Sequence, residues 1–165
     1  MRTIDNINSL NKSEFLSIFG NVFEKTESVA LKVFELKPFK DFDDIISKML
    51  KIYDEYDRDK ILEILNSHPE LAIEKKLTID SKLEQTSANL NECSEEEFKE
   101  FRKLNIEYKT KFGFPFIIAV KGKNKNEILV NFRERIKNDL NKEFFEAKIQ
   151  VKKIASFRLE DILSI

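Results

Sequence analysis

The sequence has no tryptophan and one residue each of histidine and cysteine among its 165 residues. With Cys93 alone, the chain cannot build a disulfide framework or a cysteine-based metal site, and a reducing compartment is compatible with it. His68 has no second histidine or cysteine to join it in a typical transition-metal site. The composition therefore offers neither a disulfide framework nor a typical transition-metal site.

An excess of charge of either sign is also missing. Lys and Arg number 29 against 30 Asp and Glu, which gives a net charge of −1. This balance argues against nucleic acid or an anionic membrane as the partner. No run approaches membrane-spanning length, residues 1–12 contain no apolar signal core, and the C-terminal Leu-Ser-Ile is no peroxisomal tail. We therefore expect a soluble cytoplasmic protein.

Glycine and proline are scarce, with three of each, so the chain has few turn signals. Most of it follows helical spacing instead, and its length suits one domain, residues 1–165, with a substantial core. We predict an all-α single-domain bundle of about eight helices. They begin at Asn11 and then cover Thr26–Leu36, Asp41–Tyr53, Asp57–Ser67, Ser81–Asn91, Ser94–Lys111, Glu127–Asn138 with Asn126 as the cap, and Leu140–Leu163.

One stretch breaks this pattern. A chain that is 36% charged carries no charge from Phe112 to Val120. Gly113 suits the left-handed position that ends a helix, Pro115 prevents the helix from resuming, and the following β-branched residues favour extended backbone. We predict one short extended segment near residues 114–120. Without a partner strand, its backbone groups must bond either to a ligand or, as in a buried connector, to side chains and water. On this evidence the connector is favoured.

His68 precedes Pro69 at a helix junction, where Pro69 is suited to open a new turn. A histidine titrates near neutral pH and can act as a general acid or base. The alternative is a junction residue that bonds a helix end, which is the commoner role for a lone histidine.

Two further places carry polar groups in unusual positions. Ser81 and Glu84 have the spacing of a capping box, although this helix start would also suit an anion. Arg158 continues an apolar stripe of the last helix, formed by Phe144, Ala147, Val151 and Ile154. A guanidinium there either pairs with an acid or binds a carboxylate in a cavity. The spacing alone favours the ion pair.

Taken in order, these motifs resemble one family. They are His68-Pro69-Glu70-Leu71-Ala72, Ser81-x-x-Glu84-Gln85, Leu104-Asn105-x-x-Tyr108-x-x-Lys111-Phe112-Gly113-Phe114-Pro115-Phe116, Arg133-x-Arg135 and Arg158-Leu159. They are similar to motifs of the 2-oxo-4-hydroxy-4-carboxy-5-ureidoimidazoline (OHCU) decarboxylases of urate breakdown, from about Phe15 to the end of the chain. The stretch from Leu104 to Phe116 is the most specific. Ile73 stands where the family usually has glycine, Glu70 replaces aspartate, and the family's Pro-Trp is missing.

The resemblance implies an all-helical homodimer that acts without a cofactor. It makes His68 the catalytic histidine, with Glu84 beside it. It implies substrate contacts from Pro69, Ser81, Gln85, Phe116, Ile117, Ile118, Ala119, Val120 and Arg158. The expected reaction is decarboxylation of OHCU to (S)-allantoin in urate degradation. The alternative is an inactive or divergent dimer of the same fold, serving as an interaction module or acting on another ureido compound.

Overall fold

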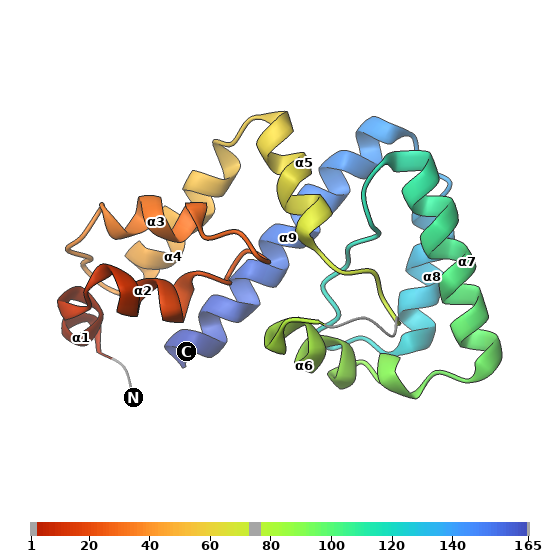
Figure 1. Cartoon of the computed structure of the whole chain (residues 1–165), viewed down its shortest axis with the longest axis horizontal. Helices are drawn as coiled ribbons and strands as arrows, with labels where there is room; N and C mark the ends of the chain where they lie inside the picture. The colour runs from red at the N-terminus through yellow and green to blue at the C-terminus, as the bar shows by residue number, and fades with distance from the viewer. Residues whose placement is uncertain (1–2, 73–76, 165) are drawn as a thin grey trace. The chain divides into compact units, whose positions relative to one another are not determined.

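A computed structural model describes residues 3–72 and 77–164, and over these residues the chain is helical without a strand (Figure 1). The all-α prediction is confirmed. The described part contains nine α-helices and one short 3-10 helix, where the sequence predicted about eight helices. The helices are α1 (Ile4–Ser9), α2 (Lys12–Phe19), α3 (Ser28–Phe34), α4 (Phe42–Asp54), α5 (Arg58–Ser67), α6 (Ile79–Ser87), η1 (Leu90–Glu92), α7 (Glu95–Phe112), α8 (Lys125–Arg135) and α9 (Leu140–Leu163).

The chain divides into two compact units. The terminal unit contains the described residues up to Ser67 and those from Lys152 onward, and the central unit contains His68–Val151. Helix α9 therefore contributes residues to both. The single domain over residues 1–165 stays a prediction, and the division into units was not foreseen from the sequence.

The terminal unit is built on aromatic packing between short helices. Helix α3 packs against both α2 and α4. The ring of Phe15 lies 4.6 Å from that of Phe19 and 5.6 Å from that of Phe34, centroid to centroid, while Phe23 stacks on Tyr53 at 4.8 Å. Buried aromatic side chains contribute large apolar areas, so these contacts compensate for the shortness of the helices.

Caps account for most helix starts that the sequence predicted. Asn11 and Glu14 form a capping box at α2, and Asp41 accepts a hydrogen bond from the backbone N–H of Asp44 at α4. Asp57 does the same for Lys60 at α5, and Ser94 with Glu97 forms a capping box at α7. Each of these predictions is confirmed, because a side-chain acceptor satisfies an N–H that the helix itself leaves free.

Three local predictions are wrong, and one helix was missed. The missed helix is α1, which Thr3 caps and in which Ile7 is fully buried. Helix α6 begins after Thr78, whose side chain accepts from the N–H of Ser81, so Ser81 lies inside the helix and is not its cap. Helix α8 is capped by Asn124 and not by Asn126. Pro69 opens no helix, since the described chain stays irregular from His68 until α6.

The central unit has Tyr108 of α7 at the centre of an aromatic cluster. Its ring centroid lies 4.5 Å from that of Phe112, 5.3 Å from Phe116 and 5.8 Å from Phe132. Helix α7 ends at Gly113, which has φ 80° and ψ 8°, so the predicted left-handed helix end is confirmed. The turn it makes leads the chain back over the cluster.

The residues that follow, 115–120, form the connecting segment. It lacks regular secondary structure, and all of its side chains from Phe116 to Val120 are buried. Among the described helices, none is long and apolar enough to cross a membrane.

Candidate active site

The proposed catalytic histidine lies directly after helix α5. That helix ends at Ser67, because the residue before a proline avoids helical backbone, as the sequence predicted. The His68 side chain is buried, with 8% of its surface exposed. A buried imidazole at the start of an irregular loop is held in a defined place, as a general acid or base requires.

Two amide side chains fix the loop that follows His68. Gln85 of α6 accepts from the Ala72 N–H at 3.0 Å through Oε1, and its Nε2 donates to the Glu70 carbonyl at 3.2 Å. Asn105 of α7 donates to the Leu71 carbonyl at 3.0 Å. Ala72 has φ 53°, in the left-handed region that alanine rarely occupies. Gln85 thus stabilises a strained backbone, and its predicted contact with substrate stays a prediction.

Helix α6 presents the remaining polar residues of this region. Ser81 and Gln85 are four residues apart on one side of the helix and both are buried, while Glu84 on the same side is half-buried. Because Thr78 caps the helix, Glu84 does not form the predicted capping box with Ser81. Gln85 therefore bonds α6, the helix that also carries Ser81 and Glu84, to the loop that follows His68 and Pro69. Ile73 lies outside the described residues.

Two buried side chains of the central unit bond the backbone of the connecting segment. Arg135 at the end of α8 donates to the Ile117 carbonyl at 2.6 Å, and the Ala119 N–H donates to Gln150 of α9 at 2.9 Å. Side chains thus satisfy part of its backbone, as the connector interpretation expects. Within residues 3–72 and 77–164, however, no hydrogen bond reaches the backbone of Ile118, which is 4% exposed. The segment is thus a connector whose backbone is bonded by side chains at Ile117 and Ala119 but not at Ile118.

Arg158 belongs to the terminal unit and forms a buried ion pair there. Its Nη2 lies 2.9 Å from Glu24 Oε2, and its Nη1 donates to the Asn21 carbonyl at 2.9 Å. Arg158 is 6% exposed and Glu24 is fully buried. The ion pair that the helical stripe favoured is present. The predicted role of Arg158 as a substrate anchor is not tested by these contacts.

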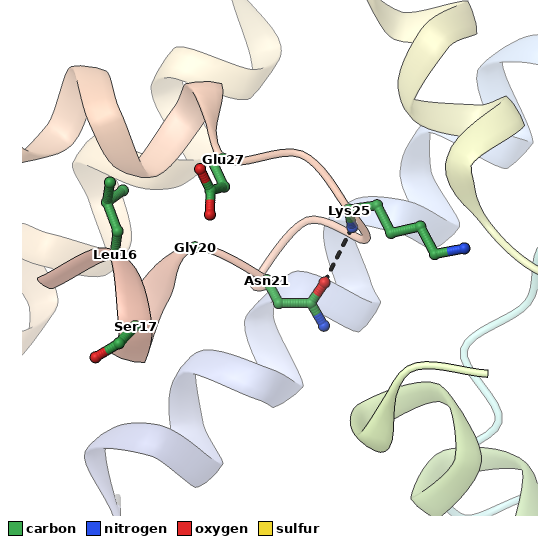
Figure 2. Close-up of a pocket in the computed structure, with 6 residues that line it drawn as sticks. All are labelled: Leu16, Ser17, Gly20, Asn21, Lys25 and Glu27. Carbon is green, nitrogen blue, oxygen red and sulfur yellow. Dashed lines mark hydrogen bonds between the residues drawn. The ribbon is translucent and has the colours of Figure 1, made fainter. Parts of the chain in front are cut away.

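A pocket of about 560 Å³ lies in the terminal unit, and one of its lining residues is Asn21, whose carbonyl accepts from Arg158 (Figure 2). It is lined by Leu16, Ser17, Gly20, Asn21, Lys25 and Glu27, with the Lys25 N–H donating to Asn21 Oδ1 at 3.0 Å. None of the predicted site residues lines this pocket, and no motif in the sequence indicated it.

The described residues contain no group of three His, Cys, Asp or Glu side chains that is suited to a metal ion. The region offers one imidazole, the carboxylates of Glu70 and Glu84, and several amide and hydroxyl groups. Such a set can move protons and orient a polar ligand through hydrogen bonds.

Comparison with known proteins places this arrangement in a family. The family model described as OHCU decarboxylase matches residues 8–160. The chain belongs to the OHCU decarboxylase family. It is 33% identical over 162 residues to a 2-oxo-4-hydroxy-4-carboxy-5-ureidoimidazoline decarboxylase of Haloferax volcanii, covering 98% of this chain and 96% of that protein.

A bifunctional uric acid degradation protein of a Bacillus species, strain TB-90, is 38% identical over 98% of this chain. The chain spans only 32% of that longer relative. Among solved structures, that of an (S)-allantoin synthase superposes with a TM-score of 0.78 at 25% identity, covering 98% of this chain and 54% of that one. The OHCU decarboxylase fold therefore extends over nearly the whole chain.

In this OHCU decarboxylase family member, sequence reasoning missed the residues that hold the connecting segment. Arg135 and Tyr108 were seen only as parts of motifs, and Glu143 and Gln150 were not singled out. A signal existed, because Glu143 and Gln150 lie at helical spacing from Ala147 on the apolar side of α9. A polar residue on an apolar stripe needs a buried partner, as Arg158 did.

Proposed function

We propose that the protein decarboxylates OHCU to (S)-allantoin, without a cofactor, in the degradation of urate. The observation that carries the proposal is membership of the OHCU decarboxylase family in a chain that keeps the family's His-Pro motif, with His68 buried directly after α5. The names of the relatives agree with this reaction.

The substrate supplies most of the chemistry. In OHCU the carboxylate is attached to a ring carbon that also bears a hydroxyl group and adjoins a C=N bond. When the bond to the carboxylate breaks, its electron pair flows into the C=N bond and CO2 leaves. Addition of one proton to the enol-like product completes allantoin. The enzyme must orient the ring and protonate one face, so positioning accounts for most of the rate.

His68 and Glu84 are the proton-transferring groups in this proposal. Pro69, Ser81 and Gln85, the backbone of Phe116, Ile117, Ile118, Ala119 and Val120, and Arg158 are assigned to substrate binding. Burial of His68 supports its role, because a desolvated donor interacts more strongly with charge that develops on the substrate. Arg158 offers the planar two-point geometry that suits a carboxylate or urea oxygen.

The direct test is to generate OHCU from urate in situ and to follow its decay and the chirality of the product. The expected result is acceleration over the spontaneous decay and formation of (S)-allantoin only. Unchanged decay with racemic allantoin contradicts the proposal and favours the inactive module. Turnover of a different ureido compound in a parallel assay identifies a divergent enzyme.

The proposal includes a homodimer, as the family resemblance implies, and a cytoplasmic location, as expected from the sequence. Large apolar side chains on helix surfaces support an assembly, with Ile79 79% and Leu83 64% exposed one turn apart on α6. Light scattering of the purified protein is expected to give twice the chain mass of 19.5 kDa. A monomeric mass at micromolar concentration contradicts this part alone.

A further inference from the structure

The connecting segment is held at two points that lie on either side of one residue. Arg135 bonds the carbonyl of Ile117 and Gln150 bonds the N–H of Ala119, at 2.6 and 2.9 Å. Both side chains are buried, each 8% exposed, and they come from different helices of the central unit. Ile118 stands between the two fixed peptide groups.

Arg135 is itself fixed by a buried carboxylate. Its Nε donates to Glu143 Oε1 at 2.7 Å. Its Nη2 lies 2.5 Å from the same oxygen but not aligned as a hydrogen bond, so Nε makes the directional contact. The guanidinium carbon also lies 4.4 Å from the ring centroid of Phe116, which stacks on Phe132 at 3.8 Å. Ion pair and ring contact together define one orientation of the guanidinium.

Glu143 is fully buried and receives three donors. Besides Arg135 Nε, Tyr108 Oη donates to Oε1 at 2.6 Å and Asn138 Nδ2 donates to Oε2 at 3.0 Å. Burial, together with the bond to Glu143, raises the pKa of the Tyr108 phenol, so it remains a donor across the physiological range. A buried carboxylate with this set of donors is strongly held in place.

Gln150 is oriented in a comparable way. Its Nε2 donates to Glu146 Oε1 at 2.7 Å, one turn earlier on α9, which points Oε1 toward the N–H of Ala119. The amide therefore cannot rotate by half a turn without losing both bonds. Like Arg135, Gln150 is oriented by a bond to another side chain as well as by its bond to the segment.

We propose that Arg135 and Gln150 are positioning residues that hold the backbone of Ile118 in the orientation that binds the ligand. The proposal rests on the proposed function, which assigns this segment to substrate binding. Arg135 and Gln150 themselves do not touch the ligand. Their role is to keep the peptide groups on both sides of Ile118 from turning, so that its N–H and C=O remain directed to one place.

The test for Gln150 uses (S)-allantoin as the probe in calorimetry on folded protein. Gln150→Ala is expected to weaken binding about three- to tenfold, the usual effect of one lost hydrogen bond. The double variant Gln150→Glu with Glu146→Gln keeps an acceptor for Ala119 and reverses the bond between the two side chains. It is expected to restore binding. Full binding by Gln150→Ala overturns the proposal, and so does a double variant that fails to recover the binding lost in Gln150→Ala.

The test for Arg135 is Arg135→Lys, which keeps a positive charge beside Glu143 but lacks a second arm for Ile117. The expected result is a rise in KM of about three- to tenfold or more, with a smaller change in kcat. Arg133→Lys is the matched control, because Arg133 lies on the same helix, half exposed and paired with Glu100. An unchanged KM in Arg135→Lys contradicts the proposal.

Amide hydrogen exchange separates this proposal from the proposed function. In the absence of any ligand, Gln150→Ala is expected to speed exchange at Ala119, and Arg135→Lys is expected to shift the amide resonance of Ile118. These changes occur even if the wild type proves unable to decarboxylate OHCU. If the wild type is active and both amides stay unchanged in folded variants, the positioning role is wrong while the function stands.

Discussion

At the scale of single residues, the sequence pointed to polar groups in unusual places but not to their partners. His68 was found because it is the only histidine and precedes a proline, and both facts are local. Arg158 was found because it continues an apolar stripe. Its partner Glu24 is 134 residues away in sequence, and no spacing rule connects the two. The partner of a buried charge is set by tertiary structure. The sequence therefore indicates that a partner is needed but not which residue it is.

His68→Ala is expected to abolish turnover while the fold is retained. Removal of a positioned general acid or base lowers the rate by about 10²–10⁴-fold. Steady-state kinetics with OHCU generated in situ measures the effect, and circular dichroism verifies the fold. A variant that keeps more than about half of the wild-type kcat contradicts the assignment, since a general acid or base typically contributes about 100-fold or more.

Arg158 requires a pair of variants, because it has a structural partner. Arg158→Met leaves Glu24 buried without its cation and is expected to lower the free energy of unfolding by about 3–5 kcal/mol. Adding Glu24→Gln removes the uncompensated charge and is expected to recover much of this loss. Urea unfolding measures both.

Activity of the same variants then separates the two roles of Arg158. If Arg158 anchors the substrate, the stabilised double variant stays inactive, and Arg158→Lys fails to restore kcat/KM because lysine lacks the planar fork. Wild-type kcat/KM in the double variant would mean that the guanidinium serves the fold alone.

At the scale of helices and segments, prediction succeeded where the signal was carried by neighbouring residues. The helix starts at Asn11 and Ser94 and the glycine end of α7 were all foreseen, since each depends on side chains within one turn. It failed at α6 and α8, where two candidate caps lie within three residues. Local chemistry permits either one there, and the packing of the helix decides between them.

Gly113→Ala tests the helix end. No atom outside its chain neighbours lies within 4 Å of the added methyl group, so the cost is that of the left-handed backbone alone. We expect a loss of about 1–2 kcal/mol in the free energy of unfolding. Gly113→Asn, which tolerates this conformation better, is expected to lose less. Equal losses in the two variants would show that the turn rearranges instead.

The connecting segment is tested by two changes at Ile118. Ile118→Val is expected to cost about 0.5–1.5 kcal/mol of stability and little affinity, because only one methylene is removed. Ile118→Pro removes the N–H and fixes φ, so it is expected to weaken (S)-allantoin binding beyond its effect on stability. Calorimetry on folded protein makes the comparison. Equal affinity of the proline variant and the wild type would return the segment to a purely structural role.

At the scale of the whole molecule, the fold class was predictable and the division into units was not. Helical periodicity and the scarcity of glycine and proline are properties of the entire chain, and they gave the all-α class. The boundaries fall at Ser67–His68 and inside helix α9, and neither has the composition of a linker. A boundary within a continuous helix leaves no mark in the sequence.

Alkaline unfolding tests how the two units depend on each other. Burial raises the pKa of Tyr53 in the terminal unit and of Tyr108 in the central unit. Both phenols thus hold their protons more tightly in the folded state. Their contribution to stability is complete below the unfolded pKa of about 10 and is lost as the pH rises above it.

We therefore expect resistance to urea to fall above about pH 10, with both phenols ionising only as the protein unfolds. Ultraviolet absorbance of phenolate, compared with circular dichroism, measures this. The double variant Tyr53→Phe with Tyr56→Phe leaves Tyr108 as the only phenol, so its absorbance then reports on the central unit alone and reveals whether the units unfold together. Complete ionisation in a protein that keeps its helical signal would contradict the burial of these side chains.

The two-point hold on the connecting segment has a consequence for how the site tolerates mutation. Every residue has a backbone C=O and every residue except proline has a backbone N–H, so a ligand held through the backbone of Ile118 does not constrain the side chain there. Selection then acts on Arg135, Gln150 and the buried Glu143, which determine the orientation of that backbone. A saturation library over Phe116–Val120, sorted for activity, would accept many apolar substitutions. The same library at Arg135 and Gln150 would accept few substitutions. This part of the site would therefore be specified mainly by residues that do not contact the ligand.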